Sequence, residues 1–479
     1  MLKNRIGLIF ILVLSLLLRL ISINQSLWLD EATSVLTTFY TLPDLFTKFL
    51  PSDFHPPFYY LVLHFWVGVF GVSELSLRMI SLISSLGIVF VTYLIGEKVA
   101  NKKVGIIASS FSATSGLLIY YSQEARMYSL ATFLISISVY FLITKNWRGF
   151  GIAYFFALFT HYLSFLMLPV FVIYVFIKRD RKDIKRFAVT LILIGLASTV
   201  FAPLFIKQLL SGLSVRENAP GWWNILGKTS FHEVAIFPAK FIFGRISFEN
   251  KYLYATLTAF CGIVYSSLVI YALPKIRKID LMSKTLLFWL LIPILTASII
   301  GLVIPVFSYF RLLFVLPALY LLISLGVSKL EAKLGYAAIC LVLFINISSS
   351  LIYLTNTRFQ RENWRGAVDY ISLNSSGKVA TVFVKDSQKE AYNFYLSKKT
   401  DINKQCNEGF FSLCNYKIVQ TVNLENLDAS YNTVWLMRYV QDIFDPGDTA
   451  RIKVEELGYE KKSEHDFNGV IIWKYENSN

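Results

Sequence analysis

The stretch that decides the fold and the site is Ser26-Leu27-Trp28-Leu29-Asp30-Glu31-Ala32-Thr33-Ser34. It follows a long apolar run at about residues 6–23, so Asp30 and Glu31 stand where that run leaves a membrane. Carboxylates beside hydrocarbon are costly and usually have a function. Taken alone, the pair allows two interpretations. Asp30 either caps a short interfacial helix with Glu31 in its first turn, or it is a catalytic group.

The composition is that of a membrane protein. Of the 479 residues, 55% are hydrophobic and 16% are aromatic, and the mean hydropathy is +0.55. Many separate runs of roughly 17–22 apolar residues recur, each long enough to cross a bilayer as a helix. In a soluble protein the net charge of +15 would point to nucleic acid. Here the excess of lysine and arginine lies in short loops between apolar runs, where it indicates which loops face the cytoplasm. We therefore expect no nucleic-acid partner.

The basic clusters predict the direction of each crossing. Lys3 and Arg5 precede the first run, which places the N-terminus in the cytoplasm and Asp30 on the outer side. The alternation continues through about eleven crossings of the plasma membrane and leaves the C-terminal part outside the cytoplasm. Residues 149–177 must turn back, so we expect two short helices that meet near His161. Arg19 is expected to snorkel to the interface, with contact to an anionic ligand as the alternative.

A sharp change in composition near residue 355 predicts two domains. Residues 1–354 read as an all-α polytopic membrane bundle, and residues 355–479 as a small extracytoplasmic α/β domain. In the second, residues 364–371 and 389–396 have helical patterns, whereas residues 379–384, 433–437 and 469–473 have strand patterns. Cys406 and Cys414 lie close together there and can pair if the domain is outside the cytoplasm. We expect this domain to be a binding or stabilising lid.

Polar groups gather on the predicted outer side only. They are Asp30, Glu31, His55, Arg78, Glu124, Arg126, Tyr128, His161 and Arg311. The predicted cytoplasmic face has cations but no cluster of acids. Acids beside arginines suit a substrate that has both a proton to lose and an anionic group to hold. A lipid phosphate fits, because arginine binds phosphate through paired hydrogen bonds.

Four motifs, in order along the chain, carry a resemblance to a known family: Leu27-Trp28-Leu29-Asp30-Glu31-Ala32, His55-Pro56-Pro57-Phe58-Tyr59-Tyr60, Leu77-Arg78-Met79 and Tyr121-Ser122-Gln123-Glu124-Ala125-Arg126-Met127-Tyr128. Together they resemble the integral-membrane glycosyltransferases of the GT-C superfamily. The chain looks most like the family 39 protein mannosyltransferases and their bacterial and archaeal relatives, which include aminoarabinose transferases. The resemblance covers about residues 1–150 and extends loosely to residues 309–313 and to Trp364-Arg365.

The resemblance implies transfer of a sugar from a polyprenyl phosphate to an acceptor hydroxyl of a lipid, glycan or protein, usually with inversion. It implies that Asp30 is the catalytic base and Glu31 its partner. Arg78 matches the arginine that closes the first outer loop of the family. It is therefore the first candidate for binding the donor phosphate, followed by Arg311 and Arg126. The candidates for substrate binding are His55, Glu124, Tyr128 and His161.

Several single residues keep more than one interpretation. Relatives often carry an aspartate in the second outer loop, where this chain has Glu124, which we expect to pair with Arg126. Alternatively, Glu124 positions the acceptor or binds a metal. A divalent metal is possible, with Asp30, Glu31, His55 and Glu124 as the candidate ligands, although not every enzyme of the GT-C superfamily needs one. His55 can also simply end a loop, and His161 can cap a short helix.

Three alternatives compete with the glycosyltransferase. One of them, a non-catalytic membrane scaffold, is disfavoured by the paired carboxylates. A transporter or flippase of lipid-linked sugars would show charged or broken helices near the membrane midplane and polar groups on both faces. An oligosaccharyltransferase resembles the same superfamily, but its tail usually carries a Trp-Trp-Asp signature. Here Trp222-Trp223-Asn224 lies in a loop and lacks the aspartate.

Overall fold

The computed structural model describes residues 2–218, 223, 226–273, 280–375, 378–384, 388–398 and 419–477. Two compact units share the chain in alternating segments. The helical unit consists of Met1–Ile23, Phe46–Leu63 and Arg78–Phe359, and the mixed unit of Asn24–Leu45, His64–Leu77 and Gln360–Asn479. The division into consecutive domains at 1–354 and 355–479 stays a prediction. Cys406, Cys414, Trp222 and Asn224 lie outside the described residues.

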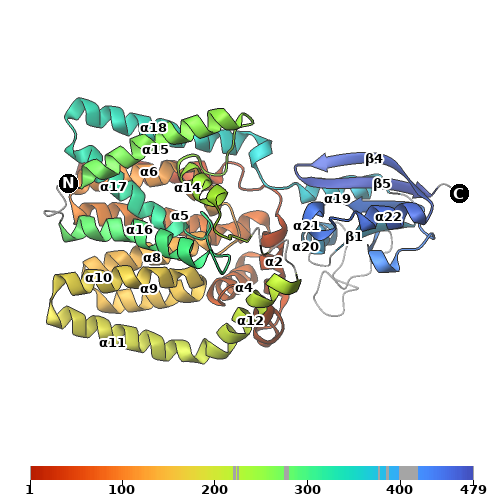
Figure 1. Ribbon diagram of the computed structural model, residues 1–479, viewed down its shortest axis with the longest axis horizontal. Coiled ribbons are helices and arrows are strands. Elements are labelled where there is room, and N and C mark those ends of the chain that lie inside the picture. Colours follow the sequence, from red (N-terminus) through yellow and green to blue (C-terminus); the bar gives the residue numbers. More distant parts are fainter. Residues whose placement is uncertain are drawn as a thin grey trace. The chain divides into compact units, whose positions relative to one another are not determined.

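The helical unit is a bundle of α-helices, most of them running alongside one another (Figure 1). Its helices are α1 (Leu2–Leu20), α6 (Lys102–Thr114), α7 (Gly116–Ser122), α8 (Tyr128–Ile143), α9 (Trp147–Thr160), α10 (Leu168–Lys178), α11 (Arg181–Ser198), α12 (Ala202–Asn218), α14 (Phe231–Phe243), α15 (Lys251–Ala272), α16 (Leu281–Ile300), α17 (Leu316–Lys329) and α18 (Ala332–Thr355). Two more, α4 (Phe58–Phe70) and α5 (Glu74–Val99), contribute residues to both units.

Among the described residues, five helices are long and apolar enough to cross a membrane, or six if the bent pair α6 and α7 is one span. Shorter apolar helices accompany them, at Ile6–Leu20, Phe58–Phe70, Tyr128–Ile143, Tyr162–Lys178 and Leu313–Lys329. The total of about eleven crossings is not confirmed by these criteria and stays a prediction. The break near His161 is confirmed, because α9 ends at Thr160 and a 3-10 segment, η4 (Tyr162–Met167), begins two residues later.

Close helix packing and internal hydrogen bonds hold the bundle together. A Cβ atom on Gly96 of α5 would lie 2.7 Å from Cα of Gly105 on α6, so small residues permit this close approach. Arg19 of α1 is fully buried. Its Nε donates to Oγ of Ser85 at 2.9 Å, and its Nη1 donates to the carbonyl of Ala113 at 2.9 Å. The expectation that Arg19 snorkels to the interface is therefore wrong, because α5 and α6 supply acceptors inside the bundle.

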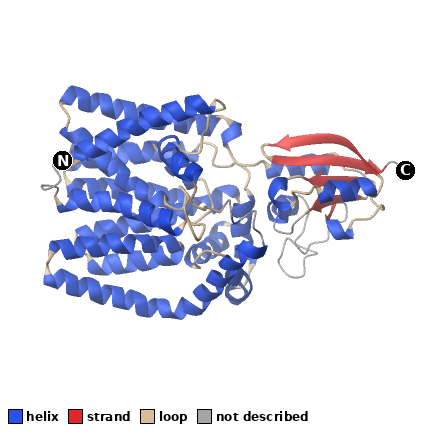
Figure 2. Cartoon of the chain, in the orientation of Figure 1, coloured by secondary structure: helices blue, strands red, loops and turns tan. Residues whose placement is uncertain are grey.

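The mixed unit contains a five-stranded sheet in the order β2-β1-β3-β5-β4. Strands β1 (Val379–Phe383), β2 (Val419–Asn423) and β3 (Thr433–Met437) are parallel, whereas β5 (Val470–Asn477) pairs antiparallel with β3 and with β4 (Tyr459–Phe467). Figure 2 shows helices beside these strands. The helices of the unit are α2 (Leu29–Leu36), α3 (Leu42–Asp44), α19 (Trp364–Leu373), α20 (Lys389–Ser397), α21 (Gln441–Phe444) and α22 (Thr449–Glu456).

The apolar core of the mixed unit lies between the sheet and α22. It includes Val382 of β1, Val434 and Leu436 of β3, and Val454 of α22, all fully buried. The predicted helices and strands of this part are confirmed, as is the fold class of a helical membrane bundle with a small C-terminal sheet domain. Strand β4 was not predicted. It pairs with β5 only, and most of its side chains are polar and exposed, so it has no apolar alternation.

Candidate active site

Helix α2 positions the two carboxylates of the first outer loop. Its N-cap is Trp28, whose side chain makes no capping hydrogen bond, and both Asp30 and Glu31 lie in the first turn. Carboxylates in a first turn are stabilised by the partial positive charge of the helix N-terminus. The interpretation of Asp30 as the cap of this helix is therefore wrong. Asp30 is half-buried, whereas Glu31 is fully buried.

Glu31 pairs with an arginine far along the chain. Nε of Arg361 lies 3.5 Å from Oε2 of Glu31, and both side chains are almost fully buried. The backbone N–H of Arg361 donates to Oε1 of Gln25 at 3.1 Å, and that of Arg365 donates to Oγ of Ser26 at 3.1 Å. These contacts attach the loop that carries Asp30 to residues 361–365. The ion pair adds to this attachment, since loss of one partner would leave a buried charge uncompensated.

Helix α20 contacts the same loop through Glu390 and Tyr395. The hydroxyl of Thr33 donates to Oε2 of Glu390, and the backbone N–H of Leu27 donates to the hydroxyl of Tyr395 at 2.7 Å. Burial raises the pKa of Glu390 to about 7; the hydrogen bond from Thr33 opposes this rise and the charge of Asp30 adds to it. Glu390 is thus a carboxyl group in electrostatic contact with Asp30. Sequence reasoning missed it, because no local pattern links residues 357 positions apart.

Tyr439 also interacts electrostatically with Asp30. The hydroxyl of Tyr439 donates to Oε1 of Glu362 at 3.2 Å, and its ring packs against Trp364 with 5.0 Å between the ring centres. Burial, followed by the charges of Glu362 and Asp30, raises the pKa of Tyr439. Its hydroxyl therefore stays protonated and acts as a hydrogen-bond donor at neutral pH.

In the helical unit, a cavity of about 300 Å³ is lined by three of the predicted residues, His55, His161 and Arg311. The ring centres of the two histidines are 6.5 Å apart. Most of the remaining wall is apolar or aromatic, with side chains that include Phe54, Tyr162, Phe205, Leu209 and Ile304. The cavity thus combines one permanent cation, two imidazoles and a hydrocarbon surface.

Backbone carbonyls fix Arg311 at the wall of this cavity. Its Nη1 donates to the carbonyls of Leu226 and Pro305, both at 2.6 Å. The loop beside it depends on Gly227, whose φ is +113° and where a Cβ would lie 2.8 Å from the carbonyl oxygen of Phe307. Only glycine adopts this conformation without strain, so this turn holds the guanidinium in place.

His55 lies between an acid and an arginine. Its Nδ1 is 3.3 Å from Oδ1 of Asp53, and its Nε2 is 3.4 Å from Nη2 of Arg126. Burial lowers the pKa of His55, and the charge of Arg126 lowers it further against the effect of Asp53, which favours a neutral ring. Burial alone would raise the pKa of Asp53, but His55 and Arg126 lower it below its usual value. Asp53 is a further residue that sequence reasoning missed, although it stands only two positions before His55.

Tyr128 belongs to a cluster of aromatic rings in the helical unit, and the charge of Glu124 acts on Tyr121 of that cluster and on Arg245. The ring centre of Tyr128 lies 5.9 Å from that of His161 and 5.2 Å from that of Phe310. Glu124 is buried. Burial alone would lower the pKa of Arg245, but nearby tyrosines and Glu124 raise it well above its usual value. The sequence did not single out Arg245, and the pairing of Glu124 with Arg126 stays a prediction.

Arg78 occupies a different position from the other predicted cations. It is fully buried, and its Nη1 donates to the carbonyl of Ile23 at 2.5 Å. Ile23 and Arg78 are the last and first residues of two segments of the helical unit, on either side of the first outer loop. Arg78 is not among the side chains that line the 300 Å³ cavity. Its role at the donor phosphate stays a prediction.

The geometry offers no evident metal site in the described part of the chain. No group of three or more histidine, cysteine, aspartate or glutamate side chains lies close enough there to hold a metal ion. The structure therefore gives no ligand set for the divalent metal that the sequence allows.

Comparison with known proteins supports the predicted resemblance. Residues 54–206 match the model of the family described as dolichyl-phosphate-mannose-protein mannosyltransferase. This segment includes His55, Arg78, Arg126 and His161, whereas Asp30 precedes it. No curated protein sequence matches the chain.

Solved structures of membrane glycosyltransferases share the fold. ArnT from Cupriavidus metallidurans in the apo state is 10% identical, with a TM-score of 0.58 over 98% of this chain and 97% of that one. The same enzyme bound to undecaprenyl phosphate is 11% identical, with the same TM-score and coverage. The oligosaccharyltransferase AglB from Archaeoglobus fulgidus, in complex with an inhibitory peptide and a dolichol-phosphate, is 12% identical. Its TM-score is 0.53 over 100% of this chain and 74% of that one.

At these identities the structural likeness establishes the fold, and the family-model match adds the resemblance in sequence. The chain has the ArnT-like fold of the GT-C glycosyltransferases and resembles the protein mannosyltransferase family within it.

Proposed function

We propose that the chain transfers a monosaccharide from a polyprenyl phosphate to an acceptor hydroxyl at the outer face of the plasma membrane. The observation that carries the proposal is the cavity lined by His55, His161 and Arg311 within a GT-C fold. Two structures with this fold hold undecaprenyl phosphate and dolichol phosphate, respectively. A polyprenyl phosphate has a hydrocarbon chain and an anionic head, which would suit the apolar wall and the guanidinium of this cavity.

In this proposal Arg311 binds the donor phosphate. A guanidinium keeps its charge at all physiological pH values and offers donors in a fixed plane, which the bonds to Leu226 and Pro305 orient. His55 and His161 add hydrogen bonds as neutral rings, and the apolar wall contacts the first isoprene units. Arg126, through His55, and Arg78 are proposed to add positive charge. As the sugar leaves the lipid, these groups stabilise the negative charge that develops on the phosphate.

Asp30 is proposed to act on the acceptor. Its carboxylate takes the proton of the acceptor hydroxyl while the oxygen forms a bond to C1 of the sugar. The bond between C1 and the phosphate oxygen breaks in the same step, and its electron pair stays with the polyprenyl phosphate. Asp30 then holds the proton and later releases it to water. This single displacement inverts the configuration at C1.

The other residues of the predicted site are proposed to support these two. Glu31 is a positioning residue, because its buried pair with Arg361 fixes the first turn of α2 and hence the direction of Asp30. Tyr128 and Glu124 are proposed to contact the sugar or the acceptor. Acceptors of three classes, lipid, glycan and protein, fit the mechanism equally.

The test uses the purified full chain in proteoliposomes with a set of radiolabelled polyprenyl-phosphate monosaccharides. Lipid, glycan and peptide acceptors are offered in turn. We expect the label to leave the polyprenyl fraction for one class of acceptor, with release of polyprenyl phosphate. Movement of the labelled lipid across the bilayer without transfer would instead identify a transporter, and transfer to asparagine amides an oligosaccharyltransferase.

A further inference from the structure

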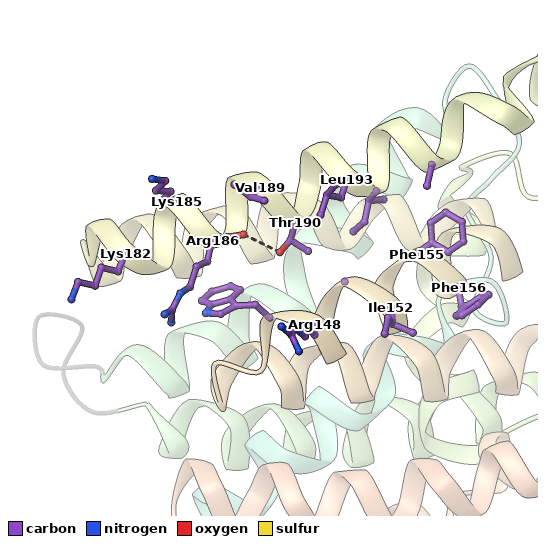
Figure 3. A pocket seen from close by; sticks show the side chains of 14 residues that line it. Arg148, Ile152, Phe155, Phe156, Lys182, Lys185, Arg186, Val189, Thr190 and Leu193 are labelled. Carbon is purple, nitrogen blue, oxygen red and sulfur yellow. Dashed lines mark hydrogen bonds between the residues drawn. The ribbon is translucent and has the colours of Figure 1, made fainter.

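A second and larger cavity lies between α9 and α11 of the helical unit and shares no residue with the site described above. Its volume is about 860 Å³. Figure 3 shows apolar side chains along it, among them Ile152 and Phe155 of α9 and Leu193 of α11. Basic side chains of both helices, including Arg148, Lys182 and Arg186, gather at one end. The groove is therefore apolar along most of its length and basic at one end.

The apolar side of this groove lacks a protein cover in the described part of the chain. The helical stretch Arg181–Glu217, which begins with α11, has a mean hydropathy of 2.3 in its most apolar window, and only 6% of that window is buried. The two helices approach each other closely at Gly151, where a Cβ would lie 2.8 Å from Cγ2 of Thr190. In a membrane, hydrocarbon must cover the apolar surface that remains.

The charges at the basic end are unbalanced. Two described acids of this segment are already paired. Nζ of Lys145 lies 2.9 Å and Nζ of Lys178 lies 3.2 Å from Oδ2 of the buried Asp183, and Nζ of Lys145 also lies 3.5 Å from Oδ2 of Asp180. Arg148, Lys182, Lys185 and Arg186 are exposed and have no ion-pair partner among the residues that the structure describes. The complementary ligand group is an anion.

A hydrogen-bond donor points to the same conclusion. Trp147 lines the groove and is held by ring contacts with Phe150 and Phe187, both with ring centres 6.4 Å apart. Its indole N–H is buried and has no acceptor among the described residues. A buried donor without an acceptor is costly, so a ligand oxygen at this position would be stabilising.

We propose that the groove between α9 and α11 binds an anionic phospholipid of the surrounding membrane. The acyl chains lie along Ile152, Phe155 and Leu193, and the phosphate lies against Arg148 and Arg186, near the indole N–H of Trp147. Free phosphate would leave the apolar wall uncovered, and a zwitterionic lipid has no net charge to match the cations. Basic pockets between membrane helices bind anionic head groups in this manner.

The test measures which lipid contacts Trp147. The full chain is reconstituted in phosphatidylcholine vesicles that contain a small fraction of either brominated phosphatidylglycerol or brominated phosphatidylcholine, whose bromines quench tryptophan fluorescence. The chain has nine tryptophans, so the signal of Trp147 is the difference between the wild type and Trp147→Phe. We expect brominated phosphatidylglycerol to quench this signal much more strongly than brominated phosphatidylcholine.

Two double variants with equal loss of charge separate the groove from the surface in general. Arg148→Gln/Arg186→Gln removes cations that line the groove, whereas Arg179→Gln/Arg181→Gln removes exposed cations of the same basic segment outside it. The first should lower the preference for the anionic lipid by about tenfold, and the second should leave it unchanged. Equal quenching by the two lipids in the wild type, or equal losses in the two variants, would overturn the proposal.

A measurement on the wild type alone gives a second test that needs no variant. Mass spectrometry of the purified chain should find retained phosphatidylglycerol, which soluble glycerol phosphate in excess does not displace. Retention of phosphatidylcholine in equal proportion to its share of the membrane would contradict the proposal.

Discussion

Two regions of the molecule bury charge in different ways. Around α2 in the mixed unit, the buried carboxylate of Glu31 meets the guanidinium of Arg361, and the pair neutralises itself inside protein. In the helical unit, Arg311 is bound by two carbonyls at the wall of a cavity and keeps its charge beside a space that a ligand can enter. The role of a charged residue beside a membrane therefore has to be inferred from the groups that it contacts. The buried pair of Glu31 and Arg361 stabilises the fold, whereas the guanidinium of Arg311 lines a cavity where it can contact a ligand.

The same contrast separates two neighbours in the sequence. Asp30 and Glu31 both lie in the first turn of α2, yet Glu31 is fully buried and paired, whereas Asp30 is half-buried. We therefore expect Glu31 to act in stability and Asp30 in the reaction, and substitution of either residue tests this division.

The largest expected effect belongs to Asp30→Asn. Because asparagine cannot accept the proton of the acceptor hydroxyl, kcat should fall on the order of 10²- to 10⁴-fold. The melting temperature should change little, since Asp30 does not cap α2 and a charge in the first turn contributes only about 0.3–1 kcal/mol. Transfer assays and thermal unfolding of the same preparation measure both quantities.

The matched control for this variant is Asp44→Asn, which changes another aspartate of the segment Asn24–Leu45. It should keep kcat within a small factor of the wild type. Full turnover by Asp30→Asn would remove Asp30 from the mechanism.

The next largest effect is expected on stability, from substitutions in the buried ion pair of Glu31 and Arg361. Glu31→Gln or Arg361→Met should each lower the free energy of unfolding by about 3–5 kcal/mol, because each leaves an uncompensated buried charge. The double variant Glu31→Gln/Arg361→Met should recover most of this loss. Thermal unfolding monitored by tryptophan fluorescence measures the three variants. Additive losses in the double variant would show that the two side chains do not act as a pair.

Arg311→Gln should weaken binding of the donor. Loss of a hydrogen-bonded charge costs about 1.5–3 kcal/mol, which corresponds to a Kd roughly ten- to a hundredfold higher. Isothermal titration with a polyprenyl phosphate measures this affinity, and Arg78→Ala is measured beside it. An unchanged Kd in either variant would remove that arginine from the donor site.

The smallest effect is a pH dependence from Glu390. Its pKa in the folded chain is about 7, above the usual value of about 4.3 for glutamate in an unfolded chain. A carboxyl group with a raised pKa contributes stability below the unfolded value, and this contribution is lost as the pH rises through the folded value. The melting temperature of the wild type should therefore fall between about pH 5 and pH 8, and Glu390→Gln should reduce this fall. Glu425→Gln, an exposed acid of the same unit, is the control and should leave the pH profile as it is in the wild type.

Local patterns predicted much of the fold. The strands at residues 379–383 and 433–437 and the helices at residues 364–373 and 389–397 follow from apolar periodicity, which acts over a few residues. The break at His161 followed from the need to return the chain between two basic clusters. Strand β4 was missed because its exposed polar side chains carry no such period.

Local sequence patterns could not predict the long-range contacts of the candidate site. Ordered motifs pointed to Asp30 and His55 and, loosely, to Arg311, and the expected turn within residues 149–177 pointed to His161. Nothing in the sequence linked Glu31 to Arg361 or Thr33 to Glu390. Each of these pairs joins the first outer loop to the C-terminal part of the chain, and only the folded structure brings them together. For the same reason, the burial of Arg19 among the hydroxyls and carbonyls of three helices could not be read from its place in an apolar run.

The anomeric configuration of the product distinguishes deprotonation of the acceptor by Asp30 from attack of Asp30 on the sugar. Nuclear magnetic resonance of the first transferred sugar gives this configuration, which is compared with that of the polyprenyl-phosphate donor. A single displacement assisted by a base predicts inversion at C1, whereas attack by Asp30 would give a covalent intermediate and retention after the second displacement. We expect inversion, and retention would rule out Asp30 as the base of a single displacement.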